Sequence, residues 1–87
     1  LLGMKPIVHS FACFLSQRPN EQIYNNATER TKITYVGSLA GLIPGGPGHS
    51  HQAVRDIAAL KAIPNLVMAE PSCAEEVAPL FNCTQQE

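Results

Sequence analysis

The sequence predicts an α/β domain: a parallel β-sheet with flanking helices. Two observations support this prediction. Runs rich in β-branched and aromatic residues alternate with runs whose apolar residues recur at helical spacing. Their order, strand, helix, strand, loop, helix, strand, helix, is typical of parallel strands joined by crossover helices. Three strands are few for this class, so we expect residues 1–87 to be part of one domain, and a fragment of a longer chain.

The first half of the chain contains two predicted strands and a helix. Residues 5–15, "KPIVHSFACFL", are rich in Ile, Val and Phe and are apolar at both alternating positions, as in a strand that is covered on both faces. Residues 19–28 form a predicted helix, because Pro19 suits a first turn and an apolar stripe follows at Ile23, Tyr24 and Ala27. Residues 32–38, "KITYVGS", form the second predicted strand.

The second half begins with a long loop rich in glycine and proline, followed by a predicted helix over residues 53–63. The apolar residues on one face of this helix are Ala53, Val54, Ile57, Ala58, Leu60 and Ile63. Pro64 and Asn65 are expected to end it, because the residue before a proline is disfavoured in a helix.

A third strand and a last helix complete the prediction. Residues 66–70, "LVMAE", read as a short strand that ends at Pro71. Residues 72–81 read as a helix with Ser72 as its cap, and Glu75 three residues later would complete a capping box.

Composition excludes some classes of function. Six basic and seven acidic residues leave no basic stripe, so nucleic acid is not an expected partner. No apolar run approaches the roughly 18–20 residues of a membrane span, so we expect no membrane association. The cysteines, Cys13, Cys73 and Cys83, are odd in number and match no zinc spacing, which indicates packing residues in a reducing, cytoplasmic compartment.

The carboxyl ends of the predicted strands carry the candidate functional residues, because ligands of open α/β sheets bind at that edge. The loop "GLIPGGPGHSHQ" could form an anion cradle before a helix, a plain turn, or one wall of a pocket. A metal site is not expected, because His49 and His51 have no carboxylate cluster nearby in sequence. An imidazole in this loop could exchange a hydrogen bond or a proton with a substrate oxygen.

Phe11 and Phe14 are three residues apart, which would place them on opposite faces of a strand. If the chain turned into a helix there, the two rings could lie together and line a flat heterocycle; core packing is the alternative.

These residues also carry a family resemblance. The segment "GGPGHSHQAVRDIAALKAIPNLVMAEPSCAEEV" resembles the pyrimidine-binding domain of transketolases, whose pattern is G-E-D-G-P-T-H-Q followed by a helix and the stop A-I-P-N. Upstream, "HSFACFLSQRPNEQI" is similar to the family's T-F-x-x-F-x-x-R-x-x-D-Q-I. The resemblance covers residues 5–80 and implies a thiamine-diphosphate-binding fold.

The resemblance implies an enzyme that transfers a two-carbon ketol unit between a ketose and an aldose, with thiamine diphosphate as cofactor. A metal, usually Mg²⁺, would be held mainly by another domain, and a homodimer or partner subunit would complete the site. Phe11 and Phe14 inherit the role of packing on the aminopyrimidine ring. His51 inherits the catalytic contact with substrate, and His49 and Ser50 are further substrate-binding candidates.

Departures from the family pattern leave alternatives open. Pro47 stands where the family has an aspartate, and Val36 lies where a histidine is frequent. The glutamate that activates the cofactor lies upstream of the matching region, so residues 1–87 alone are expected to be inactive. The alternatives are a 2-oxoacid dehydrogenase beta subunit, a deoxyxylulose phosphate synthase, or a non-catalytic domain of this fold that serves dimerisation.

Overall fold

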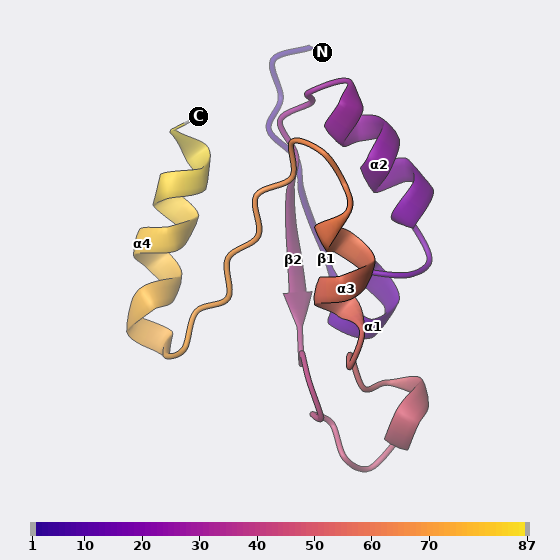
Figure 1. The fold of residues 1–87 in the computed structure, drawn as a ribbon. Helices are drawn as coiled ribbons and strands as arrows, with labels where there is room; N and C mark the ends of the chain where they lie inside the picture. Colours follow the sequence, from indigo (N-terminus) through magenta and orange to yellow (C-terminus); the bar gives the residue numbers. More distant parts are fainter. Residues whose placement is uncertain (1, 87) are drawn as a thin grey trace.

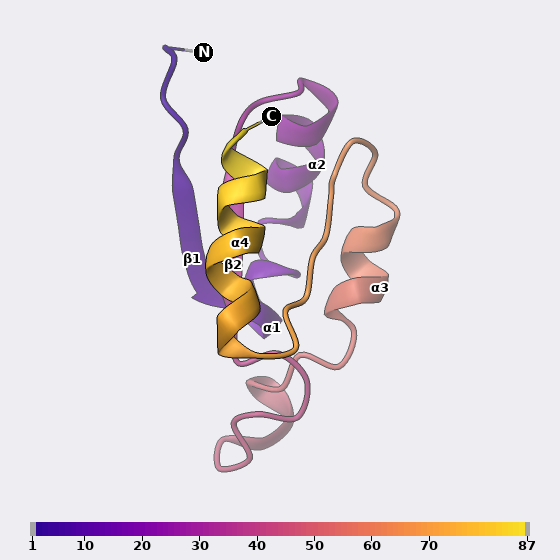
Figure 2. The same cartoon turned by 90° about the vertical axis from the view of Figure 1, so that its left-hand side faces the viewer.

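The computed structural model describes residues 2–86 and confirms an α/β fold. Two parallel strands lie side by side, with three helices on one side and the last helix on the other (Figure 1, Figure 2). In chain order the elements are β1 (Ile7–Phe11), α1 (Ala12–Leu15), α2 (Asn20–Thr28), β2 (Thr34–Ser38), the 3₁₀ turn η1 (Gly48–Ser50), α3 (Asp56–Lys61) and α4 (Ala74–Gln85).

The sheet is short because β1 ends early. The strands pair in parallel from Ile7 opposite Thr34 to Phe11 opposite Ser38, and α1 and α2 form the crossover between them. The predicted strand over residues 5–15 is therefore wrong at its end, where the chain turns into α1. The prediction that both faces are covered is also wrong, since Ile7 is 55% exposed.

The hydrophobic core lies on the side of the sheet that faces α1, α2 and α3. Ile23 of α2 is its most buried apolar side chain, at 2% exposed. The other buried apolar residues are Ala12, Leu15, Ala53 and Ile63. Asn20, the first residue of α2, connects α2 to α3. Its Nδ2 donates to the carbonyl of Ala59 in α3 at 3.2 Å and to that of Ser16 at 3.1 Å.

Helix α3 is shorter than the predicted helix over residues 53–63. Its start is delayed because Ala53 pairs with Gly41 in an isolated antiparallel bridge, which holds that residue in an extended conformation. The helix also ends earlier than predicted, at Lys61 with Ala62 as its C-cap, and Asn65 adopts a left-handed φ of 60° in the turn that follows. The Asn65 Nδ2 also donates to the carbonyl of Ala27 at 3.2 Å, which ties this turn to α2.

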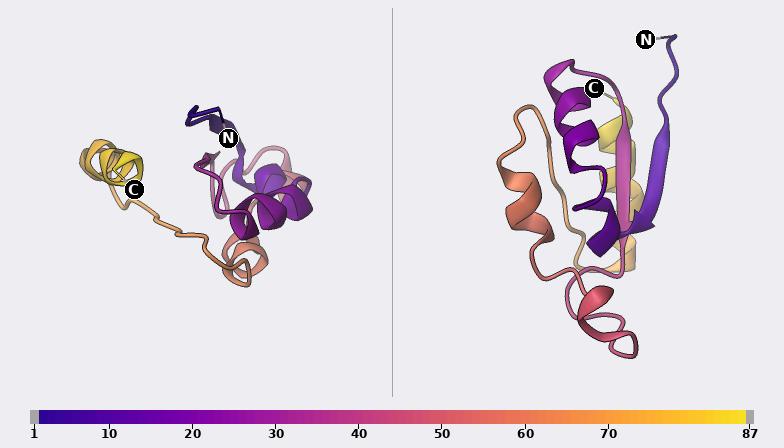
Figure 3. Two further views of the ribbon diagram at one scale, coloured as in Figure 1. Left: turned by 90° about the horizontal axis from the view of Figure 1, so that it is seen from above. Right: turned by 90° about the vertical axis from the view of Figure 1, so that its right-hand side faces the viewer.

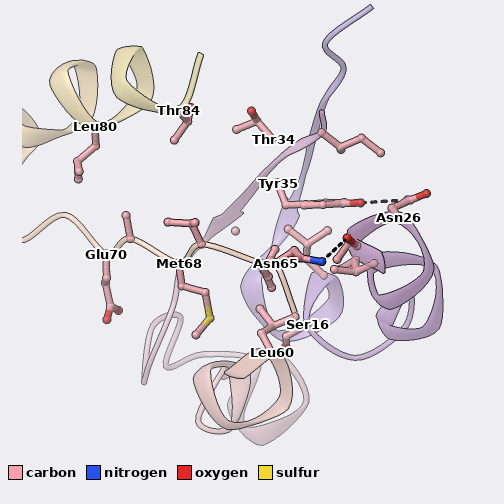
Figure 4. Close-up of a pocket in the computed structure, with 18 of the residues that line it drawn as sticks. Ser16, Asn26, Thr34, Tyr35, Leu60, Asn65, Met68, Glu70, Leu80 and Thr84 are labelled. Atoms are coloured by element: carbon pink, nitrogen blue, oxygen red, sulfur yellow. Dashed lines mark hydrogen bonds between the residues drawn. The ribbon is translucent and has the colours of Figure 1, made fainter. Parts of the chain in front are cut away.

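The predicted strand over residues 66–70 is wrong. This segment runs in the same direction as β2, but a cleft of about 960 Å³ separates the two (Figure 4). Within residues 2–86 no hydrogen bond joins the segment to β2, and Val67 is 80% exposed. A strand forms only where its backbone groups find a partner, and here β2 is too far away.

Helix α4 lies apart from the other helices, as the view from above shows (Figure 3). Its C-terminal end is tied to the sheet, because Gln85 donates to the Thr34 hydroxyl at 3.0 Å and accepts at its carbonyl from Lys5 Nζ at 2.8 Å. The helix extends past the predicted end at residue 81 and contains Pro79. In the described part of the chain, no helix combines the length and the apolar character needed to cross a membrane.

The predicted capping box at Ser72 and Glu75 is wrong, because the N-cap residue of α4 is Cys73 and it makes no side-chain capping hydrogen bond. The Ser72 backbone N–H and hydroxyl both donate to the carboxylate of Glu76, at 2.7 Å and 3.0 Å, and Glu75 does not take part. The backbone hydrogen bond from Ser72, followed by the hydroxyl, lowers the pKa of Glu76. The prediction that all cysteines are packing residues is also wrong, since Cys73 and Cys83 are exposed thiols.

Helix α1 packs very closely on β2 at Gly37. A Cβ added to Gly37 would lie 3.1 Å from the Ala12 Cβ and 3.2 Å from its Cα, closer than atoms pack comfortably. We expect Gly37→Ala to lower the free energy of unfolding by about 1–3 kcal/mol, because α1 must move away from the sheet. Urea denaturation measures this loss.

Gly45→Ala is the matched control for this substitution. A Cβ there meets no atom within 4 Å, so the free energy of unfolding should change by less than about 0.5 kcal/mol. Equal stability of the Gly37→Ala and Gly45→Ala variants would contradict the close packing of α1 on β2.

Candidate functional site

The candidate site forms where β1 turns directly into α1. Phe11 is the last residue of the strand and has extended backbone angles, φ −62° and ψ 140°, and α1 begins at the next residue. The helical turn brings Phe14 back beside Phe11, with ring centroids 6.0 Å apart and planes at 33°. The sequence predicted that the two rings could lie together only if the chain turned into a helix after Phe11. The structure shows this turn.

The long loop brings a third ring to this point. Its two ends are joined by the Gly41–Ala53 bridge, in which each backbone N–H donates to the other carbonyl, at 3.3 Å and 2.9 Å. Gln52 Nε2 adds a hydrogen bond to the Leu42 carbonyl at 3.0 Å. Because the loop is closed in this way, its last residues return to the carboxyl end of the strands, below β2 in Figure 1.

His51 lies in this returning segment, against both phenylalanines. Its ring centroid is 5.1 Å from that of Phe14 and 6.2 Å from that of Phe11, with steep interplanar angles of 70° and 62°. We call Phe11, Phe14 and His51 the aromatic cluster. Phe11 is 37% exposed and the other two are half-buried, so the cluster presents aromatic surface that a ligand can reach.

The two lesser substrate-binding candidates have different positions. The Ser50 Oγ lies 2.9 Å from His51 Nδ1, within hydrogen-bonding distance. His49 is exposed and, within residues 2–86, makes no side-chain hydrogen bond or aromatic contact. The structure therefore joins Ser50 to the aromatic cluster and leaves His49 outside it.

The loop offers little to an anion. Gly48 N–H donates to the Gly45 carbonyl within the loop, and the first turn of α3 carries the carboxylate of Asp56, which disfavours an anion there. Within the described residues, no group of three His, Cys, Asp or Glu side chains lies close enough to hold a metal ion. The arrangement can therefore bind a flat uncharged ring and offer one imidazole to a substrate.

The cleft beside β2 is a separate feature and a weaker candidate. Figure 4 shows side chains from α2, β2, α3, α4 and residues 65–70 around it. Apolar and polar side chains both line the cleft, and some of the apolar ones belong to the hydrophobic core, such as Leu15 and Ile23. No member of the aromatic cluster is among the described residues that line this cleft.

Comparison with known proteins identifies the family. The family described as "Transketolase, pyrimidine binding domain" matches residues 1–86. The chain belongs to this family. The membership confirms the predicted resemblance, and the parallel strands with flanking helices agree with it.

Curated relatives of this transketolase-family chain include three named 1-deoxy-D-xylulose-5-phosphate synthase. A protein from Thermus thermophilus is 38% identical over 77 residues, 88% of this chain and 12% of the relative. That from Anaeromyxobacter sp. is 35% identical over 75 residues, 86% of this chain and 12% of the relative. That from Bordetella petrii is 34% identical over 80 residues, 92% of this chain and 13% of the relative. The chain thus spans about an eighth of their length, and no solved structure gives a significant match.

One residue beside the aromatic cluster makes a contact that the sequence did not predict. Arg18 lies one helical turn after Phe14, and its Cζ is 4.2 Å from the centroid of the Phe14 ring. This is a cation–π contact, which stabilises the orientation of Phe14 and covers one face of its ring. This contact could not be predicted from the sequence, because the Phe14 ring reaches Arg18 only after the chain turns into α1.

The two departures from the family pattern lie on different elements. Pro47 precedes η1, and its carbonyl lies 3.5 Å from the Ser50 hydroxyl, so a backbone oxygen is present at the position of the expected acid. Val36 is an exposed residue of β2, paired in register with His9. Neither residue supplies a side chain that can exchange protons.

Proposed function

We propose that the chain is the pyrimidine-binding part of a longer thiamine-diphosphate-dependent transferase, which moves a two-carbon unit onto a sugar phosphate. The observation that supports this most strongly is the aromatic cluster at the carboxyl end of the strands, in a chain of the transketolase family. We call this longer protein the intact protein. The chain itself spans only 12% of the length of relatives such as that of Thermus thermophilus.

The aromatic cluster suits an aminopyrimidine ring. Phe11 and Phe14 present flat apolar surface, and aromatic rings bind one another in offset or tilted arrangements such as theirs. When bound, thiamine diphosphate supplies the electron sink for carbon–carbon bond cleavage and formation. In this proposal Mg²⁺ and the diphosphate are held by a different domain, as the resemblance to the transketolase family implies.

His51 is the proposed contact with substrate. It is the one member of the aromatic cluster that can form hydrogen bonds, and its Nδ1 already faces Ser50. The other ring nitrogen, Nε2, is then the atom that meets a substrate oxygen. A group in this position can orient the substrate or move a proton, which contributes roughly 10²–10⁴ to rate in known enzymes.

Two candidate reactions differ in the two-carbon unit that is transferred. A transketolase takes a glycolyl unit from a ketose. The name of the relatives, 1-deoxy-D-xylulose-5-phosphate synthase, describes a product whose first carbon is a methyl group. Such a product needs an acetyl-level unit, which a 2-oxo acid such as pyruvate supplies on losing carbon dioxide. The relatives therefore favour a 2-oxo acid donor as the second candidate, with an aldose phosphate acceptor in both.

We further propose that a second subunit, identical or not, completes the site. The exposed face of Phe11 supports this, because a cofactor ring resting there stays open to solvent unless another surface covers it. A reducing, cytoplasmic setting is part of the proposal, and the three free thiols support it.

The first test is binding of thiamine diphosphate with Mg²⁺ to the intact protein by calorimetry. Phe14→Ala should weaken binding about tenfold, because an aromatic contact and apolar burial are both lost. Tyr24→Ala, in an exposed aromatic residue of α2 outside the cluster, should leave the affinity unchanged. Absence of binding to the unmodified protein would instead favour a non-catalytic domain that serves dimerisation.

The second test concerns the reaction. Two-carbon transfer to glyceraldehyde 3-phosphate is assayed with a ketose phosphate donor and, separately, with pyruvate. His51→Ala should lower kcat at least about a hundredfold with the active donor, because the proposed group near the substrate is lost. His49→Ala, in the exposed neighbour, is the matched control and should retain activity. Unchanged transfer by His51→Ala would show that the assigned role is wrong.

A further inference from the structure

We propose that the cleft between β2 and residues 66–70 is the place of a further β-strand, supplied by the segment of the intact protein that follows residue 87. This strand runs parallel to β2 and pairs with β2 on one side and with residues 66–70 on the other. The inference rests on one part of the proposed function, namely that the chain belongs to a longer protein, and not on the reaction.

The edge of β2 that lies away from β1 is unpaired. The Thr34 N–H donates to the Pro6 carbonyl at 3.0 Å, so the backbone groups of Thr34 point toward β1. Successive residues of a strand direct their backbone groups to opposite edges, so those of Tyr35 and Gly37 point away from β1. Within residues 2–86, neither of these N–H groups donates a hydrogen bond. Gly37 is exposed and has no side chain, so it lines the cleft with backbone atoms.

Residues 66–70, on the other side of the cleft, are unpaired as well. They run in the same direction as β2 (Figure 1), and in the described part of the chain none of their backbone N–H or carbonyl groups forms a hydrogen bond. Leu66, Val67 and Met68 give the segment the composition of a strand, yet Val67 is 80% and Met68 43% exposed. Backbone groups of a strand need partners, so this segment lacks a neighbour and not the propensity.

The helices around the cleft are placed to cover a strand on both faces. Helix α4 lies on one side of the sheet and α1, α2 and α3 lie on the other (Figure 1, Figure 3). Leu80 of α4 and Leu60 of α3 both line the cleft. A strand between β2 and residues 66–70 would therefore be buried on both faces, as strands in parallel sheets are. It would also give α4, which lies apart from the other helices, a sheet to pack on.

The end of α4 indicates which segment supplies the strand. Gln85 donates to the hydroxyl of Thr34, the first residue of β2, at 3.0 Å, so the helix ends beside the amino end of β2. Thr84 and Gln85 also line the cleft. Residues that follow can enter the cleft at this point and run parallel to β2, with α4 as the crossover from residues 66–70. A segment from elsewhere in the intact protein would need another crossover of about a dozen or more residues.

The added strand has a consequence for the candidate site. Because it runs parallel to β2, its carboxyl end lies at the same edge of the sheet as the aromatic cluster, where ligands of α/β sheets bind. The residues that come directly after the strand therefore form a further wall at that edge. The cleft itself is then filled by the protein and is not a ligand site.

The first test is hydrogen exchange of backbone amides in the intact protein, followed by NMR. The amides of Tyr35 and Gly37 should exchange at least about a hundredfold more slowly than in an unstructured peptide, because a paired strand protects them. Gly46 is the control, since it is exposed and its N–H donates no hydrogen bond within residues 2–86, so it should exchange close to the unstructured rate. Exchange of Tyr35 and Gly37 as fast as that of Gly46 would show that the cleft stays open and would overturn the inference.

The second test identifies the segment in the cleft. Val67 of the intact protein is replaced by the photo-cross-linking amino acid benzoylphenylalanine, and mass spectrometry of the digested product identifies the peptide that is joined to it. The peptide should be the one directly after residue 87. The same replacement at Val54, which is 70% exposed and does not line the cleft, is the matched control and should not capture this peptide.

A cross-link from position 67 to a second copy of the protein or to another segment, or no cross-link, would overturn the assignment of the strand. The exchange measurement uses the unmodified protein, so it decides whether the cleft is filled even if the Val67 variant does not fold. Neither readout requires thiamine diphosphate or transfer activity. Failure of the proposed reaction would therefore leave these results unaffected, and failure of the strand to appear would leave the proposed reaction unaffected.

Discussion

The close contact between Ala12 and Gly37 is the constraint on which the rest of the site depends. Helix α1 can begin immediately after β1 only because the neighbouring strand has no side chain where the helix crosses it. The turn that results places Phe14 beside Phe11, and Arg18, one turn later, over the Phe14 ring. One missing Cβ thus determines whether the two phenylalanine rings lie side by side or on opposite faces of a longer strand.

A second and independent constraint brings His51 next to Phe11 and Phe14. The Gly41–Ala53 bridge closes the loop, and η1 then sets the main chain so that Ser50 and His51 are held as a pair. The aromatic cluster therefore combines a local feature, the strand-to-helix turn, with a contact across about 40 residues of sequence, from Phe11 to His51. Loss of either constraint would separate the imidazole from the rings while the sheet remained.

The sequence was informative wherever the deciding interaction is local. The α/β order, α2 and β2 follow from periodicity and turn residues. The errors occur where a distant partner decides. Residues 66–70 have the composition of a strand but find no strand within reach, and the helix expected from Ala53 begins later because Gly41 holds that residue. The contact of Arg18 could not be predicted because the Phe14 ring reaches it only after the turn into α1.

The most direct test of the proposed site is a crystal structure of the intact protein with thiamine diphosphate and Mg²⁺. We predict that the aminopyrimidine ring lies against Phe11 and Phe14, with His51 Nε2 facing the space left for substrate. An aminopyrimidine ring found in the cleft between β2 and residues 66–70, with the aromatic cluster untouched, would contradict this prediction.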